Sequence, residues 1–431
     1  MMKVVYRDNS AASNIDAAYL AGLKGKTAKP EDIERFLRSQ GEFRKNVITR
    51  KNEFKGNGET EYREVSDSLV NDFWRRMCST CECKVVKDHV YNVINSSFCI
   101  TYNPMTEYFE NLPEWDGTDY IKGVAEMVDV EPVDGETKEE AQNWFELCLK
   151  KWLVAMVATV MKLKSVNHLF FILLGKQGIF KTTWLNMLLP PELQNYVDTK
   201  NDSSRLNKDD QINTTEKLII NLEEIDDLQQ AQLNQLKALI TQEYVTERAP
   251  YERFAEKRKK IASFCGSGNN RHILNDLTGN RRFLPFWVNG ISNPRNYEYN
   301  YVGMYSQVMY LLDSGFEYWM NKDDMERQAK QQESFLQPSL EEELLLTYYR
   351  KPEGPEATKL VKASNILERI NSCIKQPLSS KKLALILERI GFEKVRTRNG
   401  ICYKVIEKSG SEINHGETAE EQDDFDKDAP F

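Results

Sequence analysis

The sequence lacks the features of a membrane protein or a secreted protein. It has no run of about 18 apolar residues. The richest stretch, Trp152 to Met161, is short and flanked by lysines, and we expect it to form a buried helix. The N-terminus has no apolar core followed by small residues, so it does not resemble a secretory signal. We therefore predict a cytoplasmic protein with no membrane partner.

The sequence also has too few cysteines for a disulfide-rich protein. Eight cysteines in 431 residues do not make a framework of disulfides, and we predict that most are small buried side chains in a reducing compartment. Cys78, Cys81 and Cys83, with His89 nearby, offer an alternative as zinc ligands. A second ligand pair at loop spacing is absent, so the buried-thiol interpretation is favoured over zinc.

Excess positive charge is lacking, since the net charge is -8. Residues 409–431 hold eight acids and one base, so this segment alone carries -7. The rest of the chain carries about -1, which leaves room for local basic surfaces. The acidic total therefore does not exclude binding to nucleic acid.

The composition and the apolar pattern indicate several structural units. Hydrophobic residues make up 40% of the chain, which is ample for a packed core. Four short apolar runs, separated by polar or helical segments, predict an α/β sheet with helices on both faces. The predicted units are a mainly helical N-terminal domain (1–115), an α/β domain (116–298), a helical connector (299–350), a winged-helix-like domain (351–408) and a disordered acidic tail (409–431).

The first apolar run, His168 to Leu174, leads into a glycine-containing loop and an apolar helix. At such a corner, backbone amides cradle the β-phosphate, a lysine neutralises the β- and γ-phosphates, and a hydroxyl binds magnesium. Phe180 stands where a second glycine usually precedes the lysine, and Gly178 is expected to supply the missing flexibility. The alternative is a simple glycine turn. We predict that ATP and Mg²⁺ are bound by Gly175, Lys176, Gln177, Gly178, Ile179, Phe180, Lys181, Thr182 and Thr183, with Thr182 on the metal.

Two carboxylates follow the second apolar run, Leu218 to Leu222. A nucleotide motor needs one acid to hold the magnesium through water and another to polarise the attacking water. We assign Glu223 to the metal and Glu224 to the base. Solvated caps at a strand end are the alternative.

Polar residues also accompany the third and fourth runs. Asn269, chosen over Asn270, is predicted to position the attacking water, although a Gly-Asn turn explains the same residues. Arg281 or Arg282 is predicted to reach across a subunit interface and stabilise charge on the transferring phosphoryl group. The alternative for the arginines is ordinary solvation.

A run of cations and aromatics between the second and third apolar runs predicts a hairpin on a DNA backbone. A solvated helix face is the alternative for its last four residues. The predicted contacts are Lys237, Arg248, Tyr251, Arg253, Lys257, Arg258, Lys259 and Lys260. The winged helix adds Lys381, Lys382, Arg396 and Arg398.

The segments GKQGIFKTTW, NLEEID, LNQLKALI, ERAPYERF, FCGSGNN and LTGNRRFLPF resemble, in this order, the virulence-associated protein E family of phages and mobile elements. The resemblance covers about residues 30 to 295. The motor of that family is related to superfamily 3 primase-helicases, with an AAA+-like P-loop NTPase core. The resemblance implies ATP-driven DNA unwinding in replication by a ring, which is expected to be a hexamer. It also implies the roles given above for Lys181, Thr182, Glu223, Glu224, Asn269 and Arg281 or Arg282.

Two further expectations come from resemblance. In relatives an aromatic residue can stand where Phe180 does. Many relatives carry an N-terminal primase, and this chain begins too late for one, so we predict no primer synthesis in cis.

The C-terminal residues Asp428, Ala429, Pro430 and Phe431 resemble the tip of bacterial single-stranded-DNA-binding proteins. That likeness implies docking into an apolar pocket of replication or repair proteins, or into an equivalent site on the chain's own ring. A tail that only solubilises the chain is the alternative.

Two functions remain open for the whole chain. The first is a DNA helicase motor, which predicts ATP hydrolysis stimulated by single-stranded DNA. The second is a nucleotide-gated initiator that binds a particular duplex without unwinding it. A small-molecule phosphotransferase is disfavoured, because the basic segment and the winged helix would have no role in it.

Overall fold

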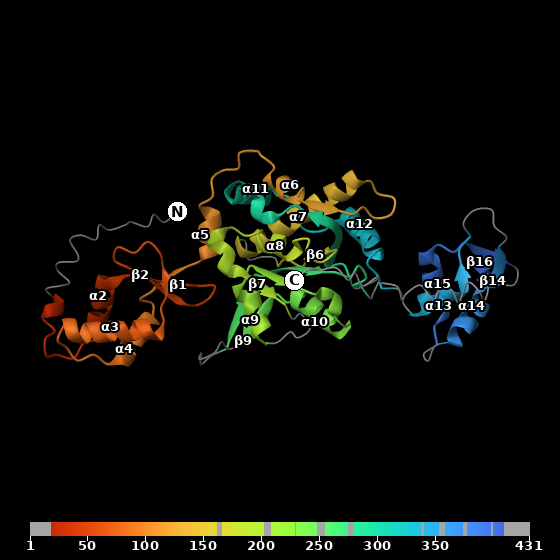
Figure 1. Ribbon diagram of the computed structural model, residues 1–431. Helices are drawn as coiled ribbons and strands as arrows, with labels where there is room; N and C mark the ends of the chain where they lie inside the picture. The colour runs from red at the N-terminus through yellow and green to blue at the C-terminus, as the bar shows by residue number, and fades with distance from the viewer. Residues whose placement is uncertain are drawn as a thin grey trace, which may run out of the picture. The chain divides into compact units, whose positions relative to one another are not determined.

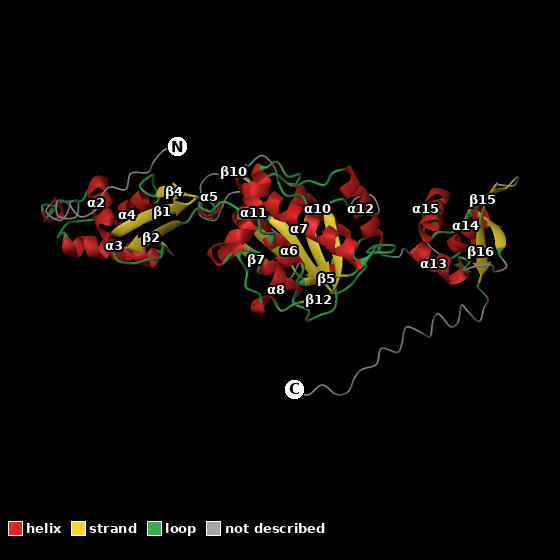
Figure 2. Cartoon of the chain, turned by 90° about the horizontal axis from the view of Figure 1, so that it is seen from above, coloured by secondary structure: helices red, strands yellow, loops and turns green. Residues whose placement is uncertain are grey.

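The computed structural model shows a mixed α/β protein with two compact units, Met1–Phe335 and Leu336–Phe431 (Figures 1 and 2). It describes residues 19–161, 166–201, 208–228, 230–247, 255–274, 280–337, 340–352, 358–373, 377–397 and 400–408. The predictions that lie outside the described residues concern Arg248, Tyr251, Arg253, Arg398, Asp428, Ala429, Pro430 and Phe431.

The first unit begins with a four-stranded sheet covered by helices. Its elements are α2 (Pro30–Gln40), β1 (Gly41–Asn46), β2 (Asn52–Gly56), β3 (Arg63–Glu64), α3 (Asp67–Thr80), α4 (Lys87–Ile94), β4 (Ile100–Tyr102) and α5 (Pro104–Glu110). The strand order is β3-β2-β1-β4. Phe43, Phe54 and Phe73 pack together beneath the helices. The sequence predicted helices here but not the sheet, because strands of two to six residues rich in charge carry little alternation.

A six-stranded sheet forms the centre of the first unit. Its strands are β5 (Val128–Val130), β6 (Phe170–Leu174), β7 (Val197–Lys200), β8 (Ile219–Leu222), β11 (Ser263–Gly268) and β12 (Phe283–Ile291). The order is β5-β12-β6-β11-β8-β7, with β5 antiparallel to β12 and the other pairs parallel. Every residue of β6, β8 and β11 is buried, which explains the apolar runs at β6 and β8 and the run from Ile261 to Cys265 that leads into β11.

Helices and a small hairpin complete the first unit. They are α6 (Tyr120–Ala125), α7 (Lys138–Met161), α8 (Lys181–Asn186), η1 (Pro191–Tyr196), α9 (Lys208–Glu216), η2 (Ile225–Asp227), α10 (Gln230–Thr241), β9 (Tyr244–Glu247), β10 (Glu256–Lys259), η3 (Pro294–Asn296), α11 (Tyr301–Asp313) and α12 (Lys322–Glu333). The stretch from Trp152 to Val160 is fully buried in α7, as predicted. None of the described helices combines the length and the apolar character needed to span a bilayer.

The predicted helical connector, residues 299–350, contains α11, α12 and the helix Leu340–Tyr348, and the boundary between the two units falls within it, after Phe335. Helix α11 packs against α7 in the central core. Helix α12 is held to β12 by buried glutamines: Gln328 Nε2 donates to the Phe283 carbonyl at 2.8 Å, and Gln332 Nε2 donates to the Asn280 carbonyl at 2.7 Å. These contacts link residues about 45 to 52 positions apart, and helical spacing alone does not reveal them.

The second unit has its own core. Its elements are α13 (Leu340–Tyr348), β13 (Tyr349–Arg350), β14 (Lys359–Lys362), α14 (Ala363–Asn371), α15 (Ser380–Ile390), β15 (Lys394–Thr397) and β16 (Gly400–Glu407). Ser379 caps α15 by accepting a hydrogen bond from the Lys382 amide at 3.2 Å, and Gly391 ends the helix with φ +87°. Strands β15 and β16 form the hairpin that the Asn399-Gly400 pair predicted.

Candidate nucleotide-binding site

A cavity of about 420 Å³ opens where β6, β8 and β11 end. Parallel strands present their carboxyl ends at one edge of a sheet, and ligands of open α/β sheets bind there. This edge brings together three segments that are far apart in the sequence. The lining consists of residues 177–183, Glu223, Glu224, Ser267, Gly268, Asn269 and Arg295.

The loop between β6 and α8 has the backbone of a tight strand-to-helix corner. Gly175 lies so close to β12 that a Cβ there would overlap the Val288 carbonyl oxygen. Gly178 takes φ +81°, and Phe180 also takes a left-handed conformation, with φ +69°. A left-handed residue other than glycine costs about 1 to 2 kcal/mol. The Phe180 side chain packs against the central core, and that contact offsets the strain.

Lys181 is the cation at the centre of this cavity. Its side chain is buried, and its ammonium donates to the carbonyls of Gly175 and Lys176, both at 2.7 Å, and to Asn269 Oδ1 at 3.1 Å. Burial lowers the pKa of Lys181, while the charge of Asp226 opposes that shift. The neighbouring Thr182 hydroxyl lies 3.1 Å from the Ser267 hydroxyl. The lysine and the threonine therefore point at the tip of β11.

Both predicted acids line the cavity after β8. Glu224 is exposed and adopts φ +53°, and Glu223 is half-buried. Asn269 lies in the lining, whereas the side-chain oxygen of Asn270 accepts the His272 amide at 3.0 Å and closes a local turn. The geometry thus distinguishes the two asparagines in the way the sequence prediction did.

Three residues of this site were not predicted. Ser267 lies between two glycines after the third apolar run, and its place at a strand end was a usable signal. Asp226 accepts the backbone amides of Asn269 and Asn270, each at 3.2 Å, and so joins the acidic loop to the tip of β11. Arg295 reaches the cavity from η3, and nothing in its local sequence marks it.

The family of the chain follows from its sequence as well as from this geometry. A family model described as the virulence-associated protein E-like domain matches residues 109–337, more than half of the chain. The chain belongs to this family. The match includes the whole candidate site and leaves the N-terminal four-stranded sheet outside it.

Other comparisons add little to this family assignment. No curated protein matches the chain. Among solved structures, an apo structure of the NrS-1 C-terminal region has 13% identity and a TM-score of 0.43, covering 88% of this chain and 99% of that one. Its A form has 13% identity and a TM-score of 0.44, covering 88% and 100%. We base no functional assignment on this likeness.

In this family member Arg281 and Arg282 lie far from the cavity of their own chain. They precede β12, at the edge where β6 begins, and the Phe170 amide donates to the Arg282 carbonyl at 2.7 Å. The five residues of β6 separate them from the loop by about 16 Å. They line a different cavity, of about 620 Å³, together with His168 and Glu243. Neither arginine reaches the cavity at the ends of β6, β8 and β11 within one chain.

The basic residues predicted to contact DNA have different environments. Lys257 is exposed on β10 and lies 4.2 Å from the Tyr244 ring centre on β9. Lys259 is half-buried in the same hairpin, and Arg396 is exposed on β15. Lys237 is half-buried on α10, with its ammonium 5.5 Å from the Phe283 ring centre. Lys381 and Lys382 on the helix Ser380–Ile390 are exposed as well, so the exposed cations of the predicted set among the described residues are Lys257, Lys381, Lys382 and Arg396.

The prediction that Lys260 contacts DNA was wrong. Its side chain is 0% exposed, and its ammonium donates to the Ile240 carbonyl. Burial lowers the pKa of Lys260 to about 7. Arg258 is also engaged within the chain, because it pairs with Glu216 at 2.7 Å and donates to the Ile48 carbonyl. The cationic run is therefore only partly a solvent-facing surface.

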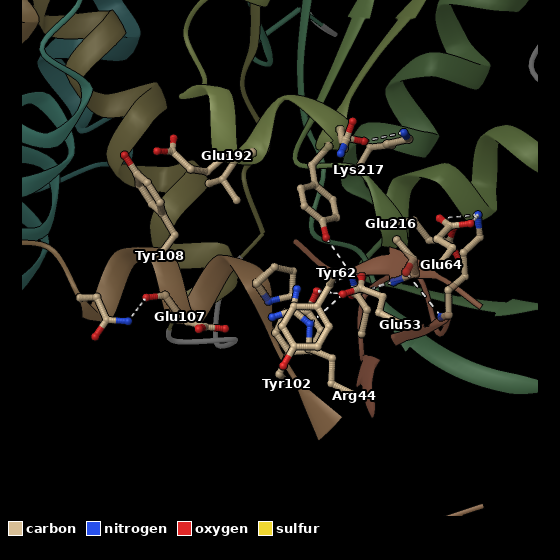
Figure 3. A pocket seen from close by; sticks show the side chains of 18 of the residues that line it. Arg44, Glu53, Tyr62, Glu64, Tyr102, Glu107, Tyr108, Glu192, Glu216 and Lys217 are labelled. Carbon is tan, nitrogen blue, oxygen red and sulfur yellow. Dashed lines mark hydrogen bonds and ion pairs between the residues drawn. The ribbon is translucent and has the colours of Figure 1, made fainter. Parts of the chain in front are cut away.

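A larger cavity, of about 900 Å³, lies between the N-terminal sheet and the segment that contains η1 (Figure 3). Figure 3 shows Tyr108 and Glu192 on the left, Arg44, Tyr62 and Tyr102 grouped in the middle, and Glu64 and Glu216 on the right. Five glutamates line this cavity, which disfavours a phosphate group there. We therefore do not assign the nucleotide to it.

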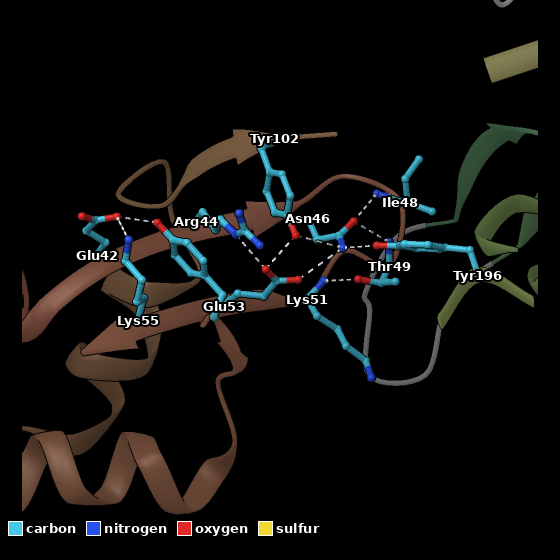
Figure 4. Close-up of polar contacts among 11 residues, drawn as sticks. Glu42, Arg44, Asn46, Ile48, Thr49, Lys51, Glu53, Lys55, Tyr102 and Tyr196 are labelled. Carbon is cyan, nitrogen blue, oxygen red and sulfur yellow. Dashed lines mark hydrogen bonds and ion pairs between the residues drawn. The ribbon is translucent and has the colours of Figure 1, made fainter. Parts of the chain in front are cut away.

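A polar network beside this cavity joins the N-terminal sheet to the central sheet (Figure 4). Arg44 lies between the Tyr62 and Tyr102 rings, 3.6 and 3.7 Å from their centres, and its Nε donates to Glu53 at 2.8 Å. Asn46 Nδ2 donates to the Tyr196 hydroxyl at 2.8 Å, at the start of β7. A direct hydrogen bond thus joins Asn46 and Tyr196, which are 150 positions apart in the sequence.

Most of the cysteines are buried, as predicted. Six of the eight are buried, and burial raises the pKa of the Cys81 thiol to about 11. Within the described residues, no three histidine, cysteine, aspartate or glutamate side chains gather as a metal site.

Proposed function

We propose that the chain is a P-loop ATPase that acts on DNA during replication of a phage or mobile element, as a superfamily 3-like helicase motor. One observation carries the proposal: Lys181, Thr182, Glu223, Glu224 and Asn269 line a single cavity at a strand-to-helix corner. Family membership supports it, because the match covers all five residues. An ordinary glycine turn would not need two acids and an asparagine around it.

Each residue has a role that its position allows. The amides of the loop and the Lys181 ammonium bind the phosphates. The Thr182 hydroxyl and the Glu223 carboxylate are hard oxygen donors, which suit Mg²⁺ held together with substrate phosphates. When bound, the metal neutralises charge on the β- and γ-phosphates. Glu224 accepts the proton of the attacking water, and the Asn269 amide orients that water.

The DNA-binding parts of the proposal are the β9–β10 hairpin and the second unit. Lys257 offers an exposed cation on the hairpin. The second unit has the order helix, two short strands, two helices and a hairpin, which we interpret as a winged helix with Arg396 on its wing. Arg281 or Arg282 is proposed to complete the site of a neighbouring copy in a hexameric ring. Their distance from their own cavity supports a role between copies.

The test compares the intact protein with Lys181→Ala, with and without single-stranded DNA. We expect ATP hydrolysis and unwinding of a forked duplex to be lost in the variant, while its circular dichroism spectrum is unchanged. Equal ATP hydrolysis by the two proteins would refute the proposal.

A second candidate is a nucleotide-gated initiator that binds duplex DNA without separating it. The winged-helix order of the second unit favours it. Sequence-selective duplex binding that responds to ATP, with no strand separation on a fork, would support this function instead.

A further inference from the structure

We propose that Arg295 binds the phosphate groups of the nucleotide held by its own chain. This inference rests on the proposed function, because it names a further residue of the same site. It assigns to the chain a second phosphate-binding cation besides Lys181, from a segment that the loop motif does not include.

The path of β12 brings Arg295 to the cavity. Strand β12 runs parallel to β6, with Trp287 paired to Leu174, and its next carbonyl, from Val288, lies against Gly175. The chain then continues to Ile291 and forms η3. The end of β12 is therefore held against the phosphate loop, and Arg295 follows it by four residues.

The backbone of Arg295 is held by a hydrogen bond, while its side chain is exposed. Asn293 Oδ1 accepts the Arg295 amide at 3.1 Å, and Pro294 is buried. The Arg295 side chain is exposed and lines the cavity. Within the described residues its guanidinium has no ion pair or hydrogen bond. Arg271 shows the contrast, since it pairs with Glu131 at 2.7 Å.

The charges of the lining favour a second cation beside the phosphates. Apart from Arg295, Lys181 is the only cationic residue among the described residues that line the cavity, and it faces the carboxylates of Glu223 and Glu224. A triphosphate brings several further negative charges. A guanidinium adds a planar pair of donors that matches phosphate oxygens, which a lysine ammonium does not.

Equilibrium binding to the full chain tests the assignment, with ADP, a non-hydrolysable ATP analogue and adenosine as ligands. Arg295→Ala is expected to weaken binding of at least one of the two nucleotides by about 10- to 100-fold, the range for a charge-assisted hydrogen bond. The nucleotide affinity of Arg295→Lys is expected to lie between those of the parent protein and Arg295→Ala, because lysine keeps the positive charge but lacks the planar pair of donors. Adenosine affinity is expected to stay unchanged.

The matched control is Arg75→Ala, which removes an exposed arginine from α3. It is expected to bind all three ligands as the parent protein does. Unchanged affinity of Arg295→Ala for both nucleotides, or an equal loss for adenosine, would overturn the assignment. Failure of the proposed function would give a different result. In that case the parent protein itself would bind ADP and the ATP analogue no more tightly than adenosine, and so would Lys181→Ala.

A mixing experiment tests whether Arg295 acts in its own chain. Lys181→Ala and Arg295→Ala are co-expressed, and their mixture is compared with each variant alone. Both changes affect the same cavity of one chain, so mixing is expected to restore no ATP hydrolysis. Restored hydrolysis would mean that a neighbouring copy supplies Arg295, and this would overturn the own-chain assignment.

Discussion

Replacing Lys260 with methionine measures the cost of burying an ammonium in the central unit. Lys260 is 0% exposed, its ammonium is bound by the Ile240 carbonyl, and the Phe264 ring centre lies 5.1 Å away. Burial lowers its pKa from 10.5 to about 7. Between these values the unfolded chain binds more protons than the folded chain, so the free energy of unfolding rises with pH.

The expected magnitude follows from the pKa difference. At about 1.4 kcal/mol per pKa unit, the buried ammonium costs about 4 to 5 kcal/mol at pH 7. Methionine removes this cost but leaves the Ile240 carbonyl without its partner, which costs about 1 to 3 kcal/mol. Lys260→Met is therefore expected to stabilise the first unit by about 1 to 4 kcal/mol at pH 7. The advantage is expected to shrink and then reverse as the pH approaches 10.

Urea denaturation of the full chain at pH 7, 8, 9 and 10 measures this difference. All seven tryptophans lie in the first unit, so their fluorescence follows that unit alone. Other groups that titrate in this range cancel when the parent and the variant are subtracted. Lys257→Met, at an exposed position of β10, is the control and is expected to show no pH-dependent difference. A stability difference between parent and Lys260→Met that stays constant across the four pH values would refute the reasoning.

Three further predictions concern the site, the domain contact and DNA. Asp226→Asn is expected to lower kcat for ATP hydrolysis at least about 10-fold with little change in KM. Gly268→Ala is expected to have the same effect, because a Cβ at this position would lie 2.5 Å from Asp226 Oδ1. If the double variant is no worse than either single variant, both changes act through the same contact. Asn46→Ala is expected to lower the stability of the first unit by about 1 to 2 kcal/mol in urea denaturation, and no loss would mean that its bond to Tyr196 is not stabilising. Lys257→Ala is expected to weaken single-stranded DNA binding and reduce its salt slope by about one, and an unchanged slope would remove this lysine from the interface.

Local patterns in the sequence were sufficient for the central strands and for most of the candidate site. Strands β6 and β8 are buried on both faces, so their sequences are almost entirely apolar and can be recognised without a structure. Strand β11 is buried as well, but only its first residues belong to the apolar run from Ile261 to Cys265. The residues that follow each strand meet at one edge because parallel strands share a direction. The loop at Lys181, the acids after β8 and Asn269 after β11 could therefore be placed together in advance.

Contacts between distant segments decided the rest. Four consecutive cations, Lys257 to Lys260, look alike in sequence, yet only Lys260 is fully buried, because it lies where β10 turns into the central sheet. Asp226 and Arg295 have ordinary local sequences, and they join the site through the approach of η2 and η3 to the strand ends. The sequence thus determined which segments form buried strands and which chemistry follows them. The tertiary structure alone determined which charged side chains are buried, paired or open to a ligand, because burial depends on neighbours that no local pattern specifies.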